Sequence, residues 1–254
     1  MSKTFRNFEA DTGKILNIVI NSLYSDRDIF LRELLSNASD AIQKRQYLGL
    51  TNPHLLNASD NRIVLRCDGK KKILEIQDTG IGLNEVELSE TLGTLAKSGT
   101  ESFLKQLEKT KDDKVAASNL IGKFGVGFYS SFMVADTVEV LTRKAGDSDV
   151  FLWTSDGQTG YEIAPSNEDL ETGTLVRLHL KKDAKDYADP EKVKAITKKY
   201  SDHISVGIHI EDKDGKQEQV NSAEALWTRP SKDITKDEYK SFYQSQFGAY
   251  DDPF

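Results

Sequence analysis

Residues 132–182, FMVADTVEVLTRKAGDSDVFLWTSDGQTGYEIAPSNEDLETGTLVRLHLKK, contain four strand-like segments in succession. β-Branched, aromatic and other apolar residues dominate each segment, and Gly, Asp and Ser residues typical of turns separate them. Such short connections join antiparallel neighbours, because a parallel pair needs a crossover of a dozen or more residues. The four segments, 132–145, 149–156, 160–165 and 173–182, therefore predict a hairpin-linked sheet.

The flanking sequence extends this prediction to an α+β fold. Apolar residues at helical spacing predict a helix in which Ser25 or Asp26 is the N-cap and Gly49 the end. Because helices come first and hairpin-linked strands follow, we expect a two-layer sandwich with helices on one face of a large, mostly antiparallel twisted sheet. The other predicted elements are helices at 11–24 and 189–204, strands at 62–68, 71–78 and 206–212, and a polar linker in 213–222.

Composition restricts the classes of function. A net charge of −7 argues against a general binder of nucleic acid or of membrane surfaces, since clustered Lys and Arg hold phosphates. The single cysteine, Cys67, excludes an internal disulfide framework and fits a reducing compartment. We expect neither a signal peptide nor a membrane span, which needs ~18 consecutive apolar residues. The last residues complete no helix or strand, so we expect the chain to stop within a second domain.

A polar stripe follows one side of the predicted helix in 33–44, ELLSNASDAIQK. At about 100° per residue, Glu33, Asn37, Asp40 and Lys44 fall within an arc of roughly 60°. An ordinary solvated helix face explains this stripe. The alternative is that it lines a pocket in which a carboxylate acts as a base and an amide oxygen binds Mg²⁺.

Two glycine-containing turns have a similar pair of interpretations. In DTGIGL, 78–83, the residues suit a β-turn, or else Asp78 accepts a hydrogen bond from a ligand amino group while Gly80 and Gly82 let a flat ring approach the backbone. In IGKFGVGFYSS, 121–131, the glycines suit a tight strand-to-helix connection, or else their bare amides converge on phosphate oxygens. Neither the G-K-[ST] of a Walker loop nor the dinucleotide pattern G-x-G-x-x-G is present.

The order of these motifs resembles that of the gyrase, heat-shock protein 90, histidine kinase and mismatch-repair ATPase superfamily. The heat-shock protein 90 family is the more similar, over nearly the whole chain. The stretches that carry the resemblance are NSLYSDRDIFLRELLSNASDA (21–41), DTGIGL (78–83), LGTLAKSGT (92–100), IGKFGVGFYSSFMVAD (121–136) and ALWTRPSKDIT (225–235). The resemblance implies a Bergerat-type ATP-binding fold.

The resemblance also implies a role for individual residues. Glu33 corresponds to the general base, Asn37 to the Mg²⁺ ligand, and Asp78 to the residue that binds the adenine amino group with Thr174 in support through ordered water. Thr91 stands where many relatives have Asn near the ribose. The remaining residues implied at the ATP site are Asp40, Ala41, Lys44, Gly82, Leu83, Leu92, Lys97, Gly122, Lys123, Phe124, Gly125, Val126, Gly127 and Phe128.

By resemblance, the chain comprises an ATP-binding domain, 1–215, with a lid at about 84–121, and then a short linker and the truncated start of a middle domain, 216–254. The family's catalytic arginine would follow residue 254, so we expect slow Mg²⁺-dependent hydrolysis of ATP to ADP from this chain. The expected partners are unfolded or near-native client proteins, with no nucleic acid and no membrane. We expect this chain to be monomeric and the whole protein to be a homodimeric clamp.

Three alternatives remain at this point. A nucleotide-sensing interaction module would bind ATP with negligible turnover, and it would not need the Glu33 carboxylate. A gyrase-type or mismatch-repair ATPase is disfavoured by the net charge and by LGTLAKSGT, and a histidine kinase by the lack of a preceding phosphoacceptor helix. No long charged linker precedes ALWTRP, unlike in the eukaryotic cytosolic members of the family, which favours a bacterial or mitochondrial-type protein. Of these two we expect a bacterial cytoplasmic protein, with the mitochondrial matrix as the alternative.

Overall fold

The computed structural model describes residues 26–56, 61–93, 127–223, 234–237, 239–240 and 243. Within these residues, eight strands form one sheet in the order β5-β4-β3-β6-β2-β1-β7-β8, and only the β1–β7 pair is parallel. The strands are β1 Arg62–Asp68, β2 Ile73–Asp78, β3 Ala135–Arg143, β4 Val150–Ser155, β5 Tyr161–Ser166, β6 Gly173–Leu180, β7 Gly207–Glu211 and β8 Gln217–Gln219. The mostly antiparallel sheet confirms the fold class predicted from the sequence.

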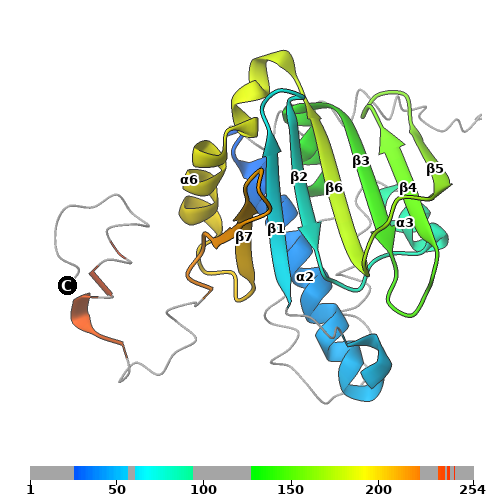
Figure 1. Cartoon of the computed structure of the whole chain (residues 1–254), viewed down its shortest axis with the longest axis horizontal. Helices are drawn as coiled ribbons and strands as arrows, with labels where there is room; N and C mark the ends of the chain where they lie inside the picture. Colours follow the sequence, from blue (N-terminus) through cyan, green and yellow to red (C-terminus); the bar gives the residue numbers. More distant parts are fainter. Residues whose placement is uncertain are drawn as a thin grey trace, which may run out of the picture.

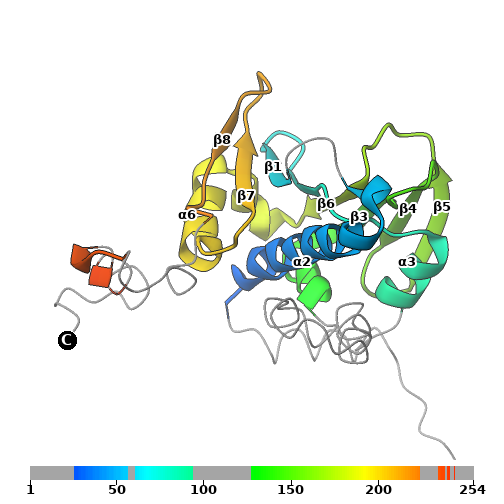
Figure 2. The same ribbon diagram turned by 90° about the horizontal axis from the view of Figure 1, so that it is seen from below.

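The helices pack on one face of this sheet (Figures 1 and 2). Apolar side chains of α2 and α6 share one core with the inward-facing residues of the central strands, including Leu31, Leu35, Leu74 and Ile76. The helices are α2 Ile29–Thr51, α3 Glu85–Leu92 and α6 Pro190–Ser201, and the short 3₁₀ helices are η1 Pro53–Leu55, η2 Gly127–Met133 and η3 Lys182–Ala188. Among the described residues, no helix combines the length and apolar character that crossing a membrane requires.

The bounds of α2 differ from the prediction for a local physical reason at each end. Asp28 is the N-cap residue, while the Asp26 carboxylate accepts the Asp28 N–H at 2.9 Å just before the helix. Gly49 does not end the helix, which continues for two more residues. A Cβ at Gly49 would lie 2.1 Å from Leu56 Cδ2, so this glycine allows the following segment to pack closely.

The sheet also extends beyond the predicted end of its last strand. Residues 217–219, expected in the linker, form the edge strand β8 and pair with β7. Asn221 is buried, and its side chain bonds the Ile208 N–H at 2.8 Å and the carbonyls of Ile204 and Val206. The structured part of the sheet layer therefore reaches Asn221 and includes the first residues of the predicted linker.

The face of the sheet away from the helices carries a row of alternating charges across neighbouring strands. In the strand register, Glu139, Arg177, Glu75, Arg66 and Glu211 follow one another from β3 to β7. Arg177 bonds Glu75 at 2.7 Å and Glu139 at 3.0 Å, and Arg66 bonds Glu211 at 2.6 Å. Opposite charges on adjacent strands stabilise the pairing on this face.

Candidate nucleotide site

Asp78 ends β2 on the helix-facing side of the sheet and is only 7% exposed. Its Oδ1 accepts the Gly80 N–H at 2.8 Å. Burial raises the pKa of Asp78 to about 7, although the backbone amides of Gly80 and Thr174 and the charge of Arg45 act in the opposite direction. A carboxyl group that is buried yet held by backbone amides has the properties of a ligand-binding group, because perturbed pKa values concentrate at functional sites.

Arg45, which the sequence prediction missed, holds the turn that follows Asp78. Its guanidinium donates to the Leu55 carbonyl at 2.6 Å and to the Thr79 carbonyl at 2.9 Å, and the residue is 5% exposed. Burial lowers the pKa of Arg45, and the charge of Asp78 opposes this shift. The available signal was the position of Arg45 three residues after Ile42, within the apolar stripe of α2.

The glycines of this turn pack closely against neighbouring segments of the protein. A Cβ at Gly80 would lie 2.6 Å from the Ala41 Cβ, and a Cβ at Gly82 would lie 2.0 Å from the Arg143 carbonyl oxygen. Gly82 also has a φ of +64°, in the left-handed region that favours glycine. The protein itself fills the space on the Cβ side of both glycines, so they allow the turn to pack against α2 and β3. The approach of a flat ring to their backbone stays a prediction.

Thr174 lies opposite Asp78 in the β2–β6 register, which brings these two predicted residues together. Its hydroxyl is 3.1 Å from that of Thr142 on β3, a fully buried residue that the sequence prediction also missed. The Thr142 hydroxyl in turn accepts the Leu83 N–H at 2.9 Å. Alternation along β3 gave the signal, because Thr142 follows the buried residues Val138 and Val140 at a spacing of two.

Glu33 lies near the N-terminal end of α2 and directly beside Gly127, the last glycine of the predicted phosphate-binding stretch. A Cβ at Gly127 would be 2.4 Å from Glu33 Oε2. The other carboxylate oxygen, Oε1, pairs with the Arg32 guanidinium at 2.6 Å. The structure therefore brings Glu33 and Gly127 together, as predicted for two residues of one site.

The polar stripe of α2 runs between the Asp78 turn, which Ala41 contacts, and Gly127, which Glu33 contacts. Glu33 and Ala41 are separated by eight residues, which corresponds to about 12 Å along a helix. Asn37 lies between them and is half-buried, and Asp40 is only 4% exposed, so the stripe is not a simple solvated face. Burial lowers the pKa of Lys44, with Glu87 opposing the shift and Lys144 adding to it.

Leu92 and Phe128, both predicted as pocket walls, are joined through Tyr129. The Tyr129 hydroxyl donates to the Leu92 carbonyl at 2.8 Å, and the Phe128 ring packs edge-on against Tyr129 and Trp153 with centroids 5.5 Å apart in each pair. Thr91 is half-buried on α3. The other predicted residues, Lys97, Gly122, Lys123, Phe124, Gly125 and Val126, the predicted lid from 94 onward and the helix at 11–24 lie outside the described residues.

The donor set near Asn37 suits a hard cation. Asn37 and Glu33 lie one helical turn apart on α2, and their side chains offer oxygen atoms of the kind that Mg²⁺ prefers. Among the described residues there is no group of three or more His, Cys, Asp or Glu side chains that could hold a metal by itself. Mg²⁺ in nucleotide sites is commonly held by one or two protein oxygens together with substrate phosphates, and these residues fit that mode.

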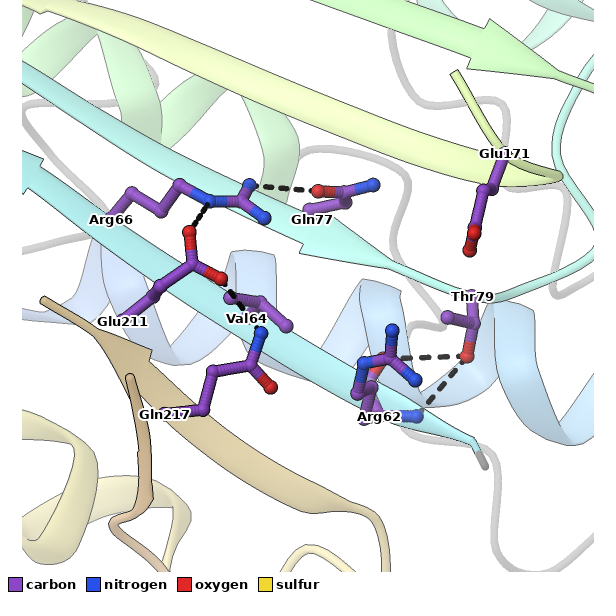
Figure 3. Close-up of a pocket in the computed structure, with 8 residues that line it drawn as sticks. All are labelled: Arg62, Val64, Arg66, Gln77, Thr79, Glu171, Glu211 and Gln217. Atoms are coloured by element: carbon purple, nitrogen blue, oxygen red, sulfur yellow. Dashed lines mark hydrogen bonds and ion pairs between the residues drawn. The ribbon is translucent and has the colours of Figure 1, made fainter. Parts of the chain in front are cut away.

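A hollow of about 280 Å³ opens on the opposite side of the sheet and is separate from these residues (Figure 3). It is lined by Arg62, Val64, Arg66, Gln77, Thr79, Glu171, Glu211 and Gln217. Gln77 and Asp78 are neighbours in β2 and point to opposite faces, so the hollow and the predicted site share strands but no space. Ion pairing between Arg66 and Glu211 and a bond from Arg66 to Gln77 already satisfy part of its lining.

Two protein-family models match the sequence of this chain. The model described as "Histidine kinase-, DNA gyrase B-, and HSP90-like ATPase" matches residues 27–172, and the model described as "Hsp90 protein" matches residues 209–254. The first match includes α2, the Asp78 turn and strand β3 with Thr142, and it ends just before β6. Both matches agree with the resemblance found in the sequence.

Similar proteins include chaperone protein HtpG of Rickettsia prowazekii (strain Madrid E), which is 48% identical over 256 residues, with 100% of this chain and 41% of that protein covered. The HtpG proteins of Rickettsia rickettsii (strain Sheila Smith) and Orientia tsutsugamushi (strain Boryong) are 48% and 46% identical, with 98% and 100% of this chain and 40% of each of those proteins covered. The chain thus spans about two fifths of the length of these relatives. It belongs to the histidine kinase-, DNA gyrase B- and HSP90-like ATPase family and, within that family, to the Hsp90 proteins.

Proposed function

We propose that the chain binds ATP along α2, with the adenine at the Asp78 turn and the phosphates at the end that holds Glu33 and Gly127, and that it hydrolyses the ATP with Mg²⁺. The observation that carries this proposal is the arrangement of α2. At one end, Ala41 contacts the turn with the buried carboxylate, and at the other end Glu33 adjoins the glycine stretch. The separation of about 12 Å along the helix suits an extended nucleotide.

Each residue has a role that follows from its chemistry. Ionised Asp78 accepts hydrogen bonds from the adenine amino group, because a carboxylate has only acceptor sites. Glu33 takes a proton from the attacking water, and its carboxylate must first give up part of its bond to Arg32. Asn37 is the candidate to hold Mg²⁺, which would neutralise charge that develops on the phosphates. Lys97 and the backbone of residues 122–128 are proposed to bind those phosphates.

The similar proteins are called chaperones, so we propose that this ATPase unit serves a chaperone of bacterial type that binds unfolded or near-native clients in the cytoplasm. We divide the chain into an ATP-binding domain that extends through β8 and Asn221, and the start of a middle domain after it. We propose that the whole protein is a homodimer. Turnover by this chain should be slow, because an arginine from the remainder of the protein would contribute roughly 10³–10⁵ in kcat.

The nucleotide-sensing alternative has one observation in its favour, which is the ion pair between Arg32 and Glu33 at 2.6 Å. The Arg32 guanidinium occupies Glu33 Oε1, so that oxygen is not available to bond an attacking water. Such a module would bind ATP and would release almost no phosphate. Measurement of turnover in a longer chain that includes the rest of the protein, beside this chain, separates the two functions.

The test combines calorimetric titration of ADP and Mg²⁺ with measurement of phosphate release from ATP. Glu33→Gln should keep ADP affinity within a few-fold and lower turnover by about 10²–10⁴. Glu162→Gln on the exposed strand β5 is the matched control and should change neither quantity. Binding of ADP without measurable turnover, both by this chain and by a longer chain that includes the rest of the protein, would favour the sensing module. A wild type that fails to bind ADP would refute the nucleotide site.

A further inference from the structure

Thr142 forms the centre of a buried hydrogen-bond network directly behind the Asp78 turn. Its hydroxyl lies 2.9 Å from the Leu83 amide nitrogen, 3.1 Å from the Gly173 carbonyl oxygen and 3.1 Å from the Thr174 hydroxyl. The residue is fully buried on β3.

Only one arrangement of protons satisfies all three contacts. The Leu83 amide can only donate and the Gly173 carbonyl can only accept, and a hydroxyl has one proton and two lone pairs. Thr142 must therefore accept from Leu83 and donate to Gly173, which leaves it only a lone pair for Thr174. The Thr174 hydroxyl must then donate to Thr142, so it has only acceptor capacity for anything else that reaches it.

Asp78 lies opposite Thr174 and has the same polarity. Its Oδ1 accepts the Gly80 N–H, and an ionised carboxylate has no proton to donate. With Asp78 ionised, as it is above its raised pKa of about 7, the floor formed by Asp78 and Thr174 presents acceptors only. A ligand group, or a water, that bonds to this floor must supply the proton.

We propose that Thr142 is a specificity-determining positioning residue, which commits the Thr174 proton and so makes this floor select a purine with an exocyclic amino group over one with a carbonyl at the same place. The inference rests on the proposed ATP site and adds a residue that does not touch the nucleotide. An amino group at this position donates to the acceptors, whereas a carbonyl oxygen faces them without a shared proton, and unpaired buried polar groups lose binding free energy.

The test compares the affinities of ADP and inosine diphosphate, which differ at this position by an amino group and a carbonyl. Wild-type protein should prefer ADP by at least about tenfold. Thr142→Val keeps the shape but removes the hydroxyl, so the Thr174 proton is free to turn toward the ligand. The preference for ADP should then fall by about tenfold, the value of roughly one hydrogen bond.

Two controls separate positioning from general damage. Thr142→Ser keeps the hydroxyl and should restore the wild-type preference, and Thr137→Val, on the other face of β3, should leave the preference unchanged. An unchanged preference in Thr142→Val, or equal loss in Thr142→Ser, overturns the inference. Should Thr142→Val not fold, equal affinity of the wild type for the two nucleotides overturns it. A wild type that binds neither nucleotide refutes the proposed function itself, and this inference with it.

Discussion

Asp78→Asn is expected to stabilise the ligand-free protein at alkaline pH and, in the same variant, to weaken ADP binding. The carboxyl has an ordinary pKa of 3.8, and burial raises this pKa to about 7 in the folded protein. One unit of difference between folded and unfolded pKa values corresponds to about 1.4 kcal/mol. Ionisation of Asp78 therefore weakens the folded state by up to roughly 4 kcal/mol when no ligand is bound.

The direction of the pH dependence follows from the raised folded pKa. Stability from the protonated carboxyl is complete below about pH 3.8 and is lost as the pH rises through about 7. Asparagine does not ionise, so the unfolding free energy of the variant minus that of the wild type should increase by about 1.4 kcal/mol between pH ~6 and pH ~8. Taking this difference cancels groups present in both proteins, among them His203, whose pKa is lowered by burial against the charge of Asp202.

Urea denaturation at the two pH values measures the difference, and the exposed Asp136→Asn variant on β3 is the matched control. Calorimetry on the same preparations measures ADP affinity, which should fall about 10- to 100-fold in Asp78→Asn because the amide turns an N–H donor toward the adenine amino group. Parallel pH profiles for the wild type and the variant would refute the assignment of a raised pKa. Unchanged ADP affinity would refute the position of the adenine.

Three further substitutions test other parts of the structure. Gly127→Ala places a methyl group 2.4 Å from Glu33 Oε2, so phosphate release should fall at least tenfold while ADP affinity is kept. Gly69→Ala, where a Cβ has space, is the control. Turnover by Gly127→Ala equal to that of the wild type would contradict the contact with Glu33. Arg45→Met removes bonds to two carbonyls and should lower the unfolding free energy by about 3 kcal/mol in urea denaturation, and a loss below ~1 kcal/mol would show that the bonds are weak. Arg177→Met removes the arginine from its partners Glu75 and Glu139, and it should lower the unfolding free energy by about 2 kcal/mol in low salt and by less in 1 M NaCl. A loss of unfolding free energy that does not depend on salt would indicate that Arg177 stabilises the protein by packing instead of by charge.

The sheet and helix α2 could be predicted from the sequence because the residue patterns that indicate them are local. The hairpin-linked strands at 132–182 carry their own turn residues, and the strand pair around Gly69 has the same property. Periodicity placed Leu31 and Leu35 on the buried side of α2 and Glu33 and Asn37 on the other, and the burial confirms the apolar side. The end of β2 at Asp78 was also predicted, since the apolar alternation stops there.

The features that sequence reasoning missed depend on contacts between distant segments. Strand β8 consists of three exposed polar residues without alternation, and it forms because β7 offers an unpaired edge. The buried position of Arg45 depends on carbonyls that come from the turn after β2 and from η1. The network of Thr142 needs β3 and β6 to be neighbours in a particular register, which no local pattern specifies.

Neighbouring residues of β2 show that polar side chains on the two faces of the sheet have different environments. Glu75 and Gln77 lie on the outer face, where arginines on adjacent strands bond both of them. Asp78 lies on the inner face, where burial raises its pKa despite two backbone amides and the charge of Arg45. If this position served stability alone, a neutral side chain would avoid the penalty of an ionised buried group. A carboxylate held there in spite of that penalty, with the Thr174 proton turned away from it, is arranged for a partner that donates hydrogen bonds. The adenine amino group is such a partner, and the stability lost in the empty protein would be recovered when the nucleotide binds.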